Sequence, residues 1–518
     1  MSRQRIIDIT DGQTGNPAAR MARPLSLTVC DGEQVAVVGD NAAGKTRLVE
    51  TLSGILPVQS TALKFDFSPS PLRLVSENIK YIAFRDTYDG ADDNYYMQKR
   101  WNQQDIDDDM PTAGALLDRA FNAAETGSGR FLDEADRTRL HEERIRLRDR
   151  LYDMFGLKGL LDSYIISLSS GELRKFQLTR TLLYMPRVLV LDNPFIGLDA
   201  DTRAQLADLL GALVREMHLL VILVLARTDM MPSFITHVIP VEGLEVLPKI
   251  PVDDFHDKYA VCNPEPAEGQ RRSTLHDEIL SIPVKDLSSE HFYPEGPSPE
   301  IVRCTDVTIR YGSRTILRDL NWTVREGERW ALTGQNGSGK STLLSLICAD
   351  NPQGYACNIE LFGRKRGTGE SIWDIKRHIG YVSPEMHRAY LKNLPALDIV
   401  ASGLFDTVGL FMHPTAEQLE VCRLWMDVFG IAGLADRPYL RLSSGEQRLC
   451  LLARAFVKDP ELLILDEPMH GLDASRCERV KDIIDTFVQR PHKTLIMVSH
   501  YESELPSCID HSLTLTRP

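Results

Sequence analysis

Short runs of consecutive apolar residues recur along the 518-residue chain, and each is followed by a stretch whose apolar residues lie three or four positions apart. A strand with both faces covered reads as such a run, whereas the wider spacing is typical of an amphipathic helix. The alternation predicts an α/β fold with largely parallel sheets. The most apolar run, Leu219–Ala226, is far shorter than the ~20 residues that cross a bilayer, so we predict a buried strand there.

One series of motifs occurs twice, which indicates an internal duplication. GDNAAGKT at Gly39–Thr46 corresponds to GQNGSGKST at Gly334–Thr342, and each is followed by LSSGE and by an apolar strand that ends in aspartate. From the LSSGE glycine to that aspartate both copies span 21 residues, but from the loop lysine to the LSSGE glycine they span 126 and 105 residues. The first copy therefore carries a net insertion, which we place at about 86–150.

The stretch between the copies, 254–299, is rich in Pro, Glu and Ser, as in NPEPAEGQ and YPEGPSPE. This composition predicts an extended linker with at most one short helix. We therefore predict a first domain at 1–253 and a second at 300–518. Within the insertion, 133–157 has the charge spacing of a solvated amphipathic helix.

Charge and cysteine content restrict the partners and the compartment. A net charge of −14 is unlike the basic surface that nucleic-acid binding requires, so nucleic acid is not an expected partner. The nine cysteines form no CxxC pair, which favours reduced thiols over disulfides or zinc sites. The N-terminus, MSRQRIIDITDGQTG, lacks the apolar region of a secretory signal. We expect a cytoplasmic protein that reaches the inner face of the plasma membrane only through a partner such as a permease.

The pattern GxxxxGK[ST] between an apolar strand and a helix is the P-loop. Its glycines let backbone N–H groups converge on phosphate oxygens, and the helix N-terminus favours negative charge. Here the strands are predicted at Gln34–Val38 and Trp330–Thr333, and Lys45 and Lys340 are predicted to reach the β- and γ-phosphates of ATP. The predicted phosphate-binding residues are Gly39, Asp40, Asn41, Ala42, Ala43, Gly44, Lys45 and Thr46, and Gly334, Gln335, Asn336, Gly337, Ser338, Gly339, Lys340, Ser341 and Thr342.

An aspartate follows the last apolar residue of one strand in each copy, at Asp192 and Asp466. A carboxylate at the C-terminal end of a parallel strand lies at the mouth of the site, where it can hold Mg²⁺ through water. The P-loop hydroxyls of Thr46 and Ser341 supply a second oxygen ligand. The sequence thus predicts ATP and Mg²⁺ as cofactors.

LSSGE between the P-loop and the acidic strand distinguishes ABC ATPases from other P-loop enzymes, and each copy resembles that family over its whole length. The resemblance implies two ABC nucleotide-binding domains, each with a helical signature subdomain, packed head to tail. Each ATP would then lie between the P-loop of one domain and the signature of the other. The signature residues are Ser169, Ser170, Gly171 and Glu172 in the first copy, and Ser443, Ser444, Gly445 and Glu446 in the second.

The second copy resembles the family at most catalytic positions. Tyr311 matches the aromatic residue that stacks on adenine, Glu467 matches the carboxylate that activates water, and His500 matches the switch histidine. The run 471–474 matches the D-loop. One departure is Pro384, which stands where the family has the Q-loop glutamine that couples the nucleotide site to a membrane partner.

The first copy departs from the family at more positions. Asn193 replaces the catalytic glutamate, Arg227 the switch histidine and Phe84 the Q-loop glutamine, and no Phe, Tyr or Trp precedes the P-loop. Asparagine can orient a water but cannot accept its proton, and loss of a general base commonly costs about 10²–10⁴ in rate. We therefore predict a second site that hydrolyses ATP, and a first site that either holds ATP or is only structural.

A narrower resemblance concerns 351–381, NPQGYACNIELFGRKRGTGESIWDIKRHIGY, which is similar to the second domain of the ModF (PhrA) branch of tandem ABC ATPases. That branch is associated with molybdate transport and with photorepair. The resemblance implies an ATP-hydrolysing component of a transport system of the molybdate type. Two alternatives stay open, namely a soluble ABC protein that acts on the ribosome without a permease, and a DNA-repair ATPase. The short acidic linker and the lost glutamate disfavour the first, and the lack of sustained heptads disfavours the second.

Overall fold

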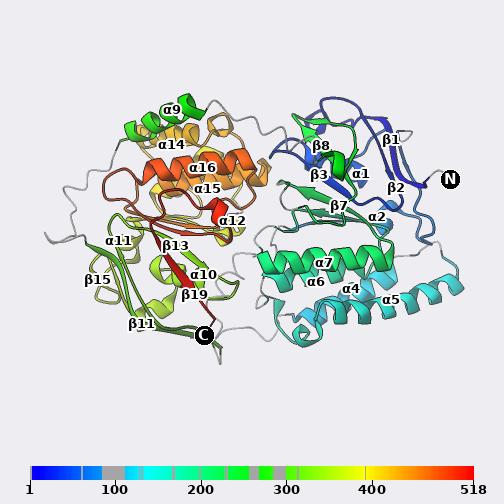
Figure 1. Cartoon of the computed structure of the whole chain (residues 1–518), viewed down its shortest axis with the longest axis horizontal. Coiled ribbons are helices and arrows are strands. Elements are labelled where there is room, and N and C mark those ends of the chain that lie inside the picture. Colours follow the sequence, from blue (N-terminus) through cyan, green and yellow to red (C-terminus); the bar gives the residue numbers. More distant parts are fainter. Residues whose placement is uncertain are drawn as a thin grey trace. The chain divides into compact units, whose positions relative to one another are not determined.

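A computed structural model describes residues 3–59, 62–84, 111–127, 129, 132–165, 168, 170–195, 198, 200–226, 228, 231–255, 268–283, 299–311, 314–390 and 392–517. The chain divides into two compact units, which comprise 3–255 and 268–517 of the described residues. Each unit is an α/β structure (Figure 1). None of the helices in these ranges is long and apolar enough to span a membrane.

The first unit contains an antiparallel sheet and a largely parallel one. The antiparallel sheet has the order β2-β1-β4, and the larger sheet has the order β10-β8-β3-β7-β6-β5, with β9 paired to β8. The strands are β1 (Arg5–Gly12), β2 (Leu25–Cys30), β3 (Val35–Val38), β4 (Leu63–Phe65), β5 (Ile79–Ala83), β6 (Val188–Asp192), β7 (Leu220–Leu225), β8 (His237–Glu242), β9 (Glu245–Val246) and β10 (Ile250–Pro251). The prediction for the most apolar run is confirmed, because β7 is fully buried and pairs in parallel with β3 and β6.

The described helices of the first unit include the predicted helix of the insertion. They are α1 (Lys45–Leu52), α2 (Val75–Asn78), α4 (Ala113–Gly127), α5 (Glu134–Met154), α6 (Ser170–Leu182) and α7 (Ala200–Met217). Helix α5 corresponds to the predicted amphipathic helix, and it begins where the Asp133 side chain accepts the N–H of Asp136 at 2.8 Å. Its buried positions include Leu140, Leu147 and Leu151, while most of its charged side chains are exposed.

The second unit repeats this plan. Its antiparallel sheet has the order β12-β11-β14-β15, and its parallel sheet has the order β16-β17-β18-β13-β19. The strands are β11 (Glu300–Tyr311), β12 (Arg314–Arg325), β13 (Arg329–Gly334), β14 (Asn358–Leu361), β15 (Arg364–Lys365), β16 (Ile379–Val382), β17 (Leu462–Asp466), β18 (Thr494–Val498) and β19 (His511–Leu515). The helices are α9 (Glu268–Ser281), α10 (Lys340–Ile347), α11 (Ile372–Lys376), α12 (Pro384–Ala389), α13 (Ala396–Ala401), α14 (Ala416–Val428), α15 (Ser444–Phe456) and α16 (Ala474–Phe487).

Sheet order places the predicted phosphate and metal residues close together in each unit. The strand before the P-loop and the strand that ends in aspartate flank a common neighbour, in the orders β3-β7-β6 and β13-β18-β17. Because these strands are parallel, their C-terminal ends lie at the same edge of the sheet. The P-loops and the acidic residues therefore meet at that edge.

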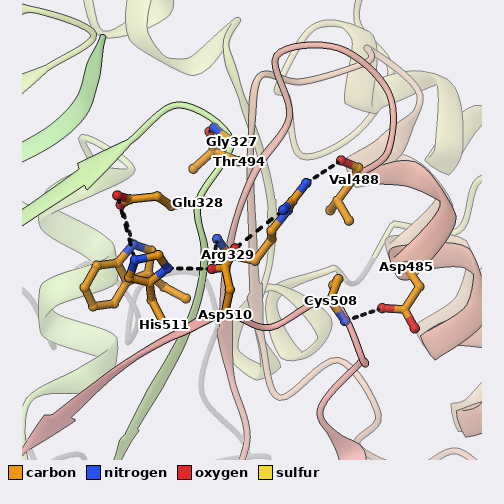
Figure 2. A network of polar contacts seen from close by, with 10 residues as sticks. Gly327, Glu328, Arg329, Asp485, Val488, Thr494, Cys508, Asp510 and His511 are labelled. Atoms are coloured by element: carbon orange, nitrogen blue, oxygen red, sulfur yellow. Dashed lines mark hydrogen bonds and ion pairs between the residues drawn. The ribbon is translucent and has the colours of Figure 1, made fainter. Parts of the chain in front are cut away.

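A polar network fixes the opposite, N-terminal end of β13 against β19 (Figure 2). The Arg329 N–H donates to Asp510 Oδ1 at 2.8 Å, and the Arg329 guanidinium donates to the Val488 carbonyl at 3.2 Å. The Trp330 indole stacks on the His511 ring with centroids 4.8 Å apart. These contacts set the register in which β19 runs alongside the strand that enters the P-loop.

The middle of the predicted linker is a helix rather than an extended segment. Helix α9 has 14 residues and packs against α16 and α14 of the second unit (Figure 1). Ile279 and Ile282 are buried in the same core as these helices, and the Arg490 guanidinium donates to the Ile282 carbonyl at 2.9 Å. The Pro, Glu and Ser content of this segment did not predict that Ile279 and Ile282 would be buried, because overall composition says nothing about the positions of single isoleucines.

We expect Ile279→Ala to lower the free energy of unfolding of the second unit by about 2–5 kcal/mol, because it empties a fully buried site. Leu280→Ala is the matched control, since the neighbouring side chain is 43% exposed. Urea unfolding followed by tryptophan fluorescence reports mainly on this unit, because four of the five tryptophans lie within 300–518. Equal effects of the two substitutions would show that α9 is not docked as described.

Candidate functional site

The second P-loop connects β13 to α10 and surrounds the amine of Lys340. Gly334, Gly337 and Gly339 have φ values of 139°, 77° and 97°, which glycine adopts without steric cost. A Cβ atom on Gly334 would also lie 2.3 Å from the Leu515 carbonyl oxygen of β19. Lys340 Nζ donates to two carbonyl oxygens at the start of the loop, at 2.7 and 3.1 Å. The loop therefore holds an ammonium group where phosphate oxygens would be received.

Two oxygen ligands meet beside this loop. Ser341 lies in the first turn of α10 and Asp466 ends β17, and Ser341 Oγ lies 3.4 Å from Asp466 Oδ2. Mg²⁺ prefers hard oxygen ligands and is usually held by one or two protein groups together with substrate phosphates and water. The donor set of this pair fits such an ion.

Glu467 directly follows β17 and faces two histidines. Its backbone is left-handed with φ 49°, and its N–H donates to the Val498 carbonyl at 3.0 Å. Glu467 Oε1 lies 3.0 Å from His500 Nε2, and Glu467 Oε2 lies 3.7 Å from His470 Nδ1. Burial would raise the pKa of Glu467, but the contact with His500 and the charges of His470 and Arg448 outweigh burial and hold this pKa well below its usual range.

Two of these neighbours were missed by sequence reasoning. His470 stands between the catalytic strand and the D-loop run, and the motif comparison assigned nothing to it. Arg448 of α15 is buried and hydrogen-bonds backbone carbonyl oxygens around Glu467. Because Arg448 binds backbone carbonyl oxygens, any residue type could stand at the partner positions. The sequence therefore contains no motif that indicates these contacts.

Tyr311, the predicted adenine platform, is held by a polar contact at the end of β11. Its hydroxyl accepts a hydrogen bond from Asn351 Nδ2 at 2.9 Å. Asn351 is itself buried just beyond α10, and its amide also donates to Ser345 Oγ at 3.3 Å. The tyrosine is therefore tied to the helix that follows the P-loop.

The first P-loop keeps the shape of the second despite its different residues. Lys45 Nζ donates to the first two carbonyl oxygens of the loop at 2.6 and 2.8 Å, and Thr46 follows in the first turn of α1. Ala42 stands where the second loop has Gly337 and still has φ 65°. A left-handed conformation costs a residue with a Cβ atom roughly 1–2 kcal/mol. Contacts with the rest of the unit must therefore stabilise this loop conformation, which Ala42 alone would disfavour.

The Asp192 carboxylate, at the end of β6, accepts hydrogen bonds from two side chains of the first unit. Tyr81 Oη donates to Asp192 Oδ2 at 2.8 Å, and Asn193 Nδ2 donates to Asp192 Oδ1 at 2.8 Å. Asn193 has φ 51° and its N–H donates to the Val224 carbonyl at 2.9 Å, which reproduces the backbone of Glu467. The first unit thus keeps the turn but carries an amide in place of the carboxylate that could accept a proton.

The two Q-loop positions lack the glutamine amide. Phe84 is buried directly after β5, with the Arg174 guanidinium 4.9 Å from its ring centroid. Pro384 is the first residue of α12, and Ser383 Oγ caps that helix by accepting a backbone N–H at 3.0 Å. A proline is well suited to this position because its missing N–H would have no partner within the helix. Arg227, the substitute for the switch histidine, lies outside the described residues.

The second signature begins α15 with a capping box. Ser443 Oγ accepts the Glu446 N–H at 3.4 Å, and the Glu446 carboxylate accepts both the N–H and the hydroxyl of Ser443 at 2.8 Å. A carboxylate at this position also interacts favourably with the helix N-terminus. Glutamate in place of the family's glutamine is therefore consistent with a stable helix start, while Ser444 and Gly445 form the first turn.

The first signature begins α6 at Ser170, and Ser169 lies outside the described residues. Gly171 and Glu172 follow in the first turn. A Cβ atom on Gly171 would lie 2.8 Å from Thr202 Cγ2 of α7, so this glycine permits close approach of the two helices.

Comparison with known proteins defines the class. The family model described as ABC transporter matches residues 22–196 and 317–470, which together make up more than half of the chain. The chain belongs to this family, and its two units are ABC ATP-binding domains with the P-loop NTPase fold. Such domains are ATPases, so the chain is a tandem ABC-type ATPase, and the assignment made from its motifs is confirmed.

Relatives resemble the chain over nearly all of its length. It is 34% identical over 94% of its residues to the ABC transporter ATP-binding protein ModF of Escherichia coli, 92% of which is covered. An uncharacterised ABC transporter ATP-binding protein of Schizosaccharomyces pombe is 30% identical, with 94% of this chain and 93% of the relative covered. An archaeal ribosome recycling factor, solved with a ribosomal stalk protein, has a TM-score of 0.51 and 17% identity over 97% of this chain and 87% of its own. This last likeness concerns the fold alone.

Proposed function

We propose that the second unit hydrolyses ATP and that the first unit binds ATP without hydrolysing it. The observation that carries this proposal is the difference at one equivalent turn, where Glu467 contacts His500 and Asn193 contacts Asp192. A carboxylate can accept a proton from the attacking water, whereas an amide cannot. The two P-loops hold their lysines in the same way, which supports phosphate binding in both units.

Mg²⁺ would be held by Ser341 and Asp466 in the hydrolytic site, where it would neutralise charge on the transferred phosphoryl group. Thr46 and Asp192 are the equivalent pair in the first unit. There both carboxylate oxygens of Asp192 already accept hydrogen bonds from Tyr81 and Asn193. We therefore propose that the first site holds Mg²⁺ less tightly than the second.

Each nucleotide is proposed to be shared between the units, as the family resemblance implies. In this arrangement the signature at Ser169, Ser170 and Gly171 covers the ATP on Lys340, and the signature at 443–445 covers the ATP on Lys45. A helix N-terminus offers unpaired backbone N–H groups and a favourable dipole to the γ-phosphate. ATP would thus draw the two units together, and hydrolysis would release them.

For the physiological role we propose the ATP-binding component of a transport system for an oxyanion of the molybdate type. The supporting observation is the likeness to the ModF branch, which covers nearly the whole chain. The Q-loop positions hold Phe84 and Pro384, which cannot make the hydrogen bonds of the family's glutamine. We therefore expect ATP hydrolysis by the purified chain without a permease.

Nucleotide stoichiometry tests the two-site proposal. We expect two ATP molecules per chain in equilibrium binding, and one in either Lys45→Ala or Lys340→Ala, because each substitution removes the ammonium from one loop. Wild-type binding of a single ATP that only Lys340→Ala abolishes would show that the first unit is structural.

Molybdenum uptake tests the physiological proposal. Cells that lack the chain should accumulate less molybdenum from limiting molybdate, and wild-type chain but not Glu467→Gln should restore uptake. Unchanged molybdenum content, together with salt-resistant cosedimentation with ribosomes, would instead support the ribosomal alternative. Unchanged content with increased sensitivity to DNA damage would support the repair alternative.

A further inference from the structure

Arg448 is a fully buried arginine that donates hydrogen bonds to four backbone carbonyl oxygens of the described residues. It lies in α15, four residues after Ser444, and is 1% exposed. Its guanidinium donates to Ser383 at 3.0 Å, to Pro468 at 3.3 Å and to Asp466 at 2.9 Å, and it also contacts the carbonyl of Glu467. One side chain therefore connects the signature helix, the Q-loop position and the turn that carries the catalytic candidate.

Burial of a guanidinium is costly unless its N–H groups are satisfied, and arginine carries five of them in a rigid planar fork. Here the carbonyl partners belong to two segments, 383 and 466–468, and neither is adjacent in sequence to Arg448. If the signature helix or one of these segments moves, the others must follow or lose hydrogen bonds at a buried site. The Arg448 side chain therefore couples the positions of these segments, instead of satisfying only the backbone of its own helix.

The turn held by Arg448 is also conformationally unfavourable. Glu467 has φ 49°, a region that residues with a Cβ atom adopt only when their surroundings enforce it. Hydrogen bonds from Arg448 to the carbonyls of Asp466 and Glu467 lie on both sides of this residue's Cα atom. Loss of these bonds would allow the turn to relax and would move the carboxylate away from its working position.

We propose that Arg448 is a positioning residue that fixes the Glu467 turn and couples it to movement of the signature helix. This inference rests on the proposed hydrolysis at Glu467 and adds a route by which the state of the signature reaches the hydrolytic carboxylate. The first unit has Arg174 at the equivalent position, where its guanidinium lies over the Phe84 ring. The arginine in that unit thus contacts the residue that replaces its Q-loop glutamine.

The test compares Arg448→Lys with Arg454→Lys. Lysine keeps the charge, but a single ammonium cannot replace the planar fork that reaches carbonyls on both segments. Arg454 lies in the same helix and is also buried, but it donates to Ser402 Oγ at 3.1 Å and to the Thr407 carbonyl at 3.2 Å, away from the Glu467 turn. Both variants lose hydrogen bonds of a buried arginine, so loss of stability alone should affect them alike.

We expect Arg448→Lys to lower kcat about 10²-fold, as expected for a catalytic group displaced by about 1 Å, with the KM for ATP and the number of ATP molecules bound close to wild type. Arg454→Lys should keep the wild-type kcat per bound ATP. Similar kcat values for the two variants, or a loss of ATP binding in Arg448→Lys, would overturn the proposal. Should Arg448→Lys not fold, Arg448→Gln against Arg454→Gln gives the same comparison without a buried charge.

Failure of the positioning role of Arg448 can be distinguished from failure of the proposed hydrolysis at Glu467. If wild-type chain hydrolyses ATP and Glu467→Gln does not, hydrolysis at Glu467 stands whatever Arg448 does. If Glu467→Gln retains wild-type turnover, the proposed function itself fails. If Glu467→Gln is inactive and Arg448→Lys either has the same kcat as Arg454→Lys or loses ATP binding, the positioning role alone is refuted.

Discussion

Replacing Glu467 by glutamine is expected to lower steady-state ATP turnover by about 10²–10⁴-fold while two ATP molecules remain bound. Glutamine is nearly isosteric with glutamate and can still orient a water molecule, but it cannot accept a proton. The side chain that faces His500 would therefore keep its place and lose its function as a base. Bound ATP should then persist, which nucleotide trapping on the purified chain would detect.

The matched control is Asn193→Gln, which changes the equivalent position of the first unit. Asn193 has nearly the same φ as Glu467, 51° against 49°, so the two substitutions are placed on turns of the same conformation, one in each unit. We expect turnover in this variant to remain far above that of Glu467→Gln. Loss of turnover in Asn193→Gln with activity retained in Glu467→Gln would reverse the assignment of the hydrolytic unit.

A second large effect is expected for Gly171→Asp, which should abolish hydrolysis although it lies in the unit with the degenerate catalytic residues. In the proposed arrangement this signature covers the ATP on Lys340, so an added carboxylate would repel the γ-phosphate. Gly445→Asp places the same charge against the non-hydrolytic ATP and should leave residual turnover. Steady-state ATPase assays of the two variants side by side measure the difference.

Steric effects within the first unit need a separate control. Any side chain at Gly171 brings a Cβ atom to 2.8 Å from Thr202 Cγ2, so part of the loss could come from displaced helices. Gly171→Ala introduces the same Cβ atom without the charge, and the change Thr202→Ser removes the methyl group it meets. We expect Gly171→Ala with Thr202→Ser to hydrolyse ATP and Gly171→Asp with Thr202→Ser not to. Equal activity of Gly171→Asp and Gly445→Asp would refute the asymmetry between the sites.

The phosphate loops and acidic strands were predictable because their chemistry is local. Glycines, a lysine and a hydroxyl at fixed spacing must form one loop, and a continuous apolar run such as Leu220–Leu225 must be a covered strand. The identity of Asn193 also predicted an amide at the turn where the second unit carries the Glu467 carboxylate. For these features the sequence motif and the structural element coincide.

The contacts around the motifs were not predictable in the same way. Arg448 binds backbone carbonyls, Tyr81 reaches Asp192 from a neighbouring strand, and His470 meets Glu467 across a turn. Each depends on which strands become neighbours and how a turn is oriented, and no spacing rule encodes this. Helix α9 was underestimated for a related reason, since its anchors are two isoleucines in a polar segment.

Docking of α9 on the second unit shortens the tether between the two ATP-binding domains. With 268–281 committed to that unit, only residues 256–267 separate it from the described end of the first unit. A chain of twelve residues spans at most about 40–45 Å when fully extended. A tether of this length corresponds to an effective concentration of about millimolar. If ATP draws the units together as proposed, their association is intramolecular, and ATPase activity per chain should stay constant on dilution.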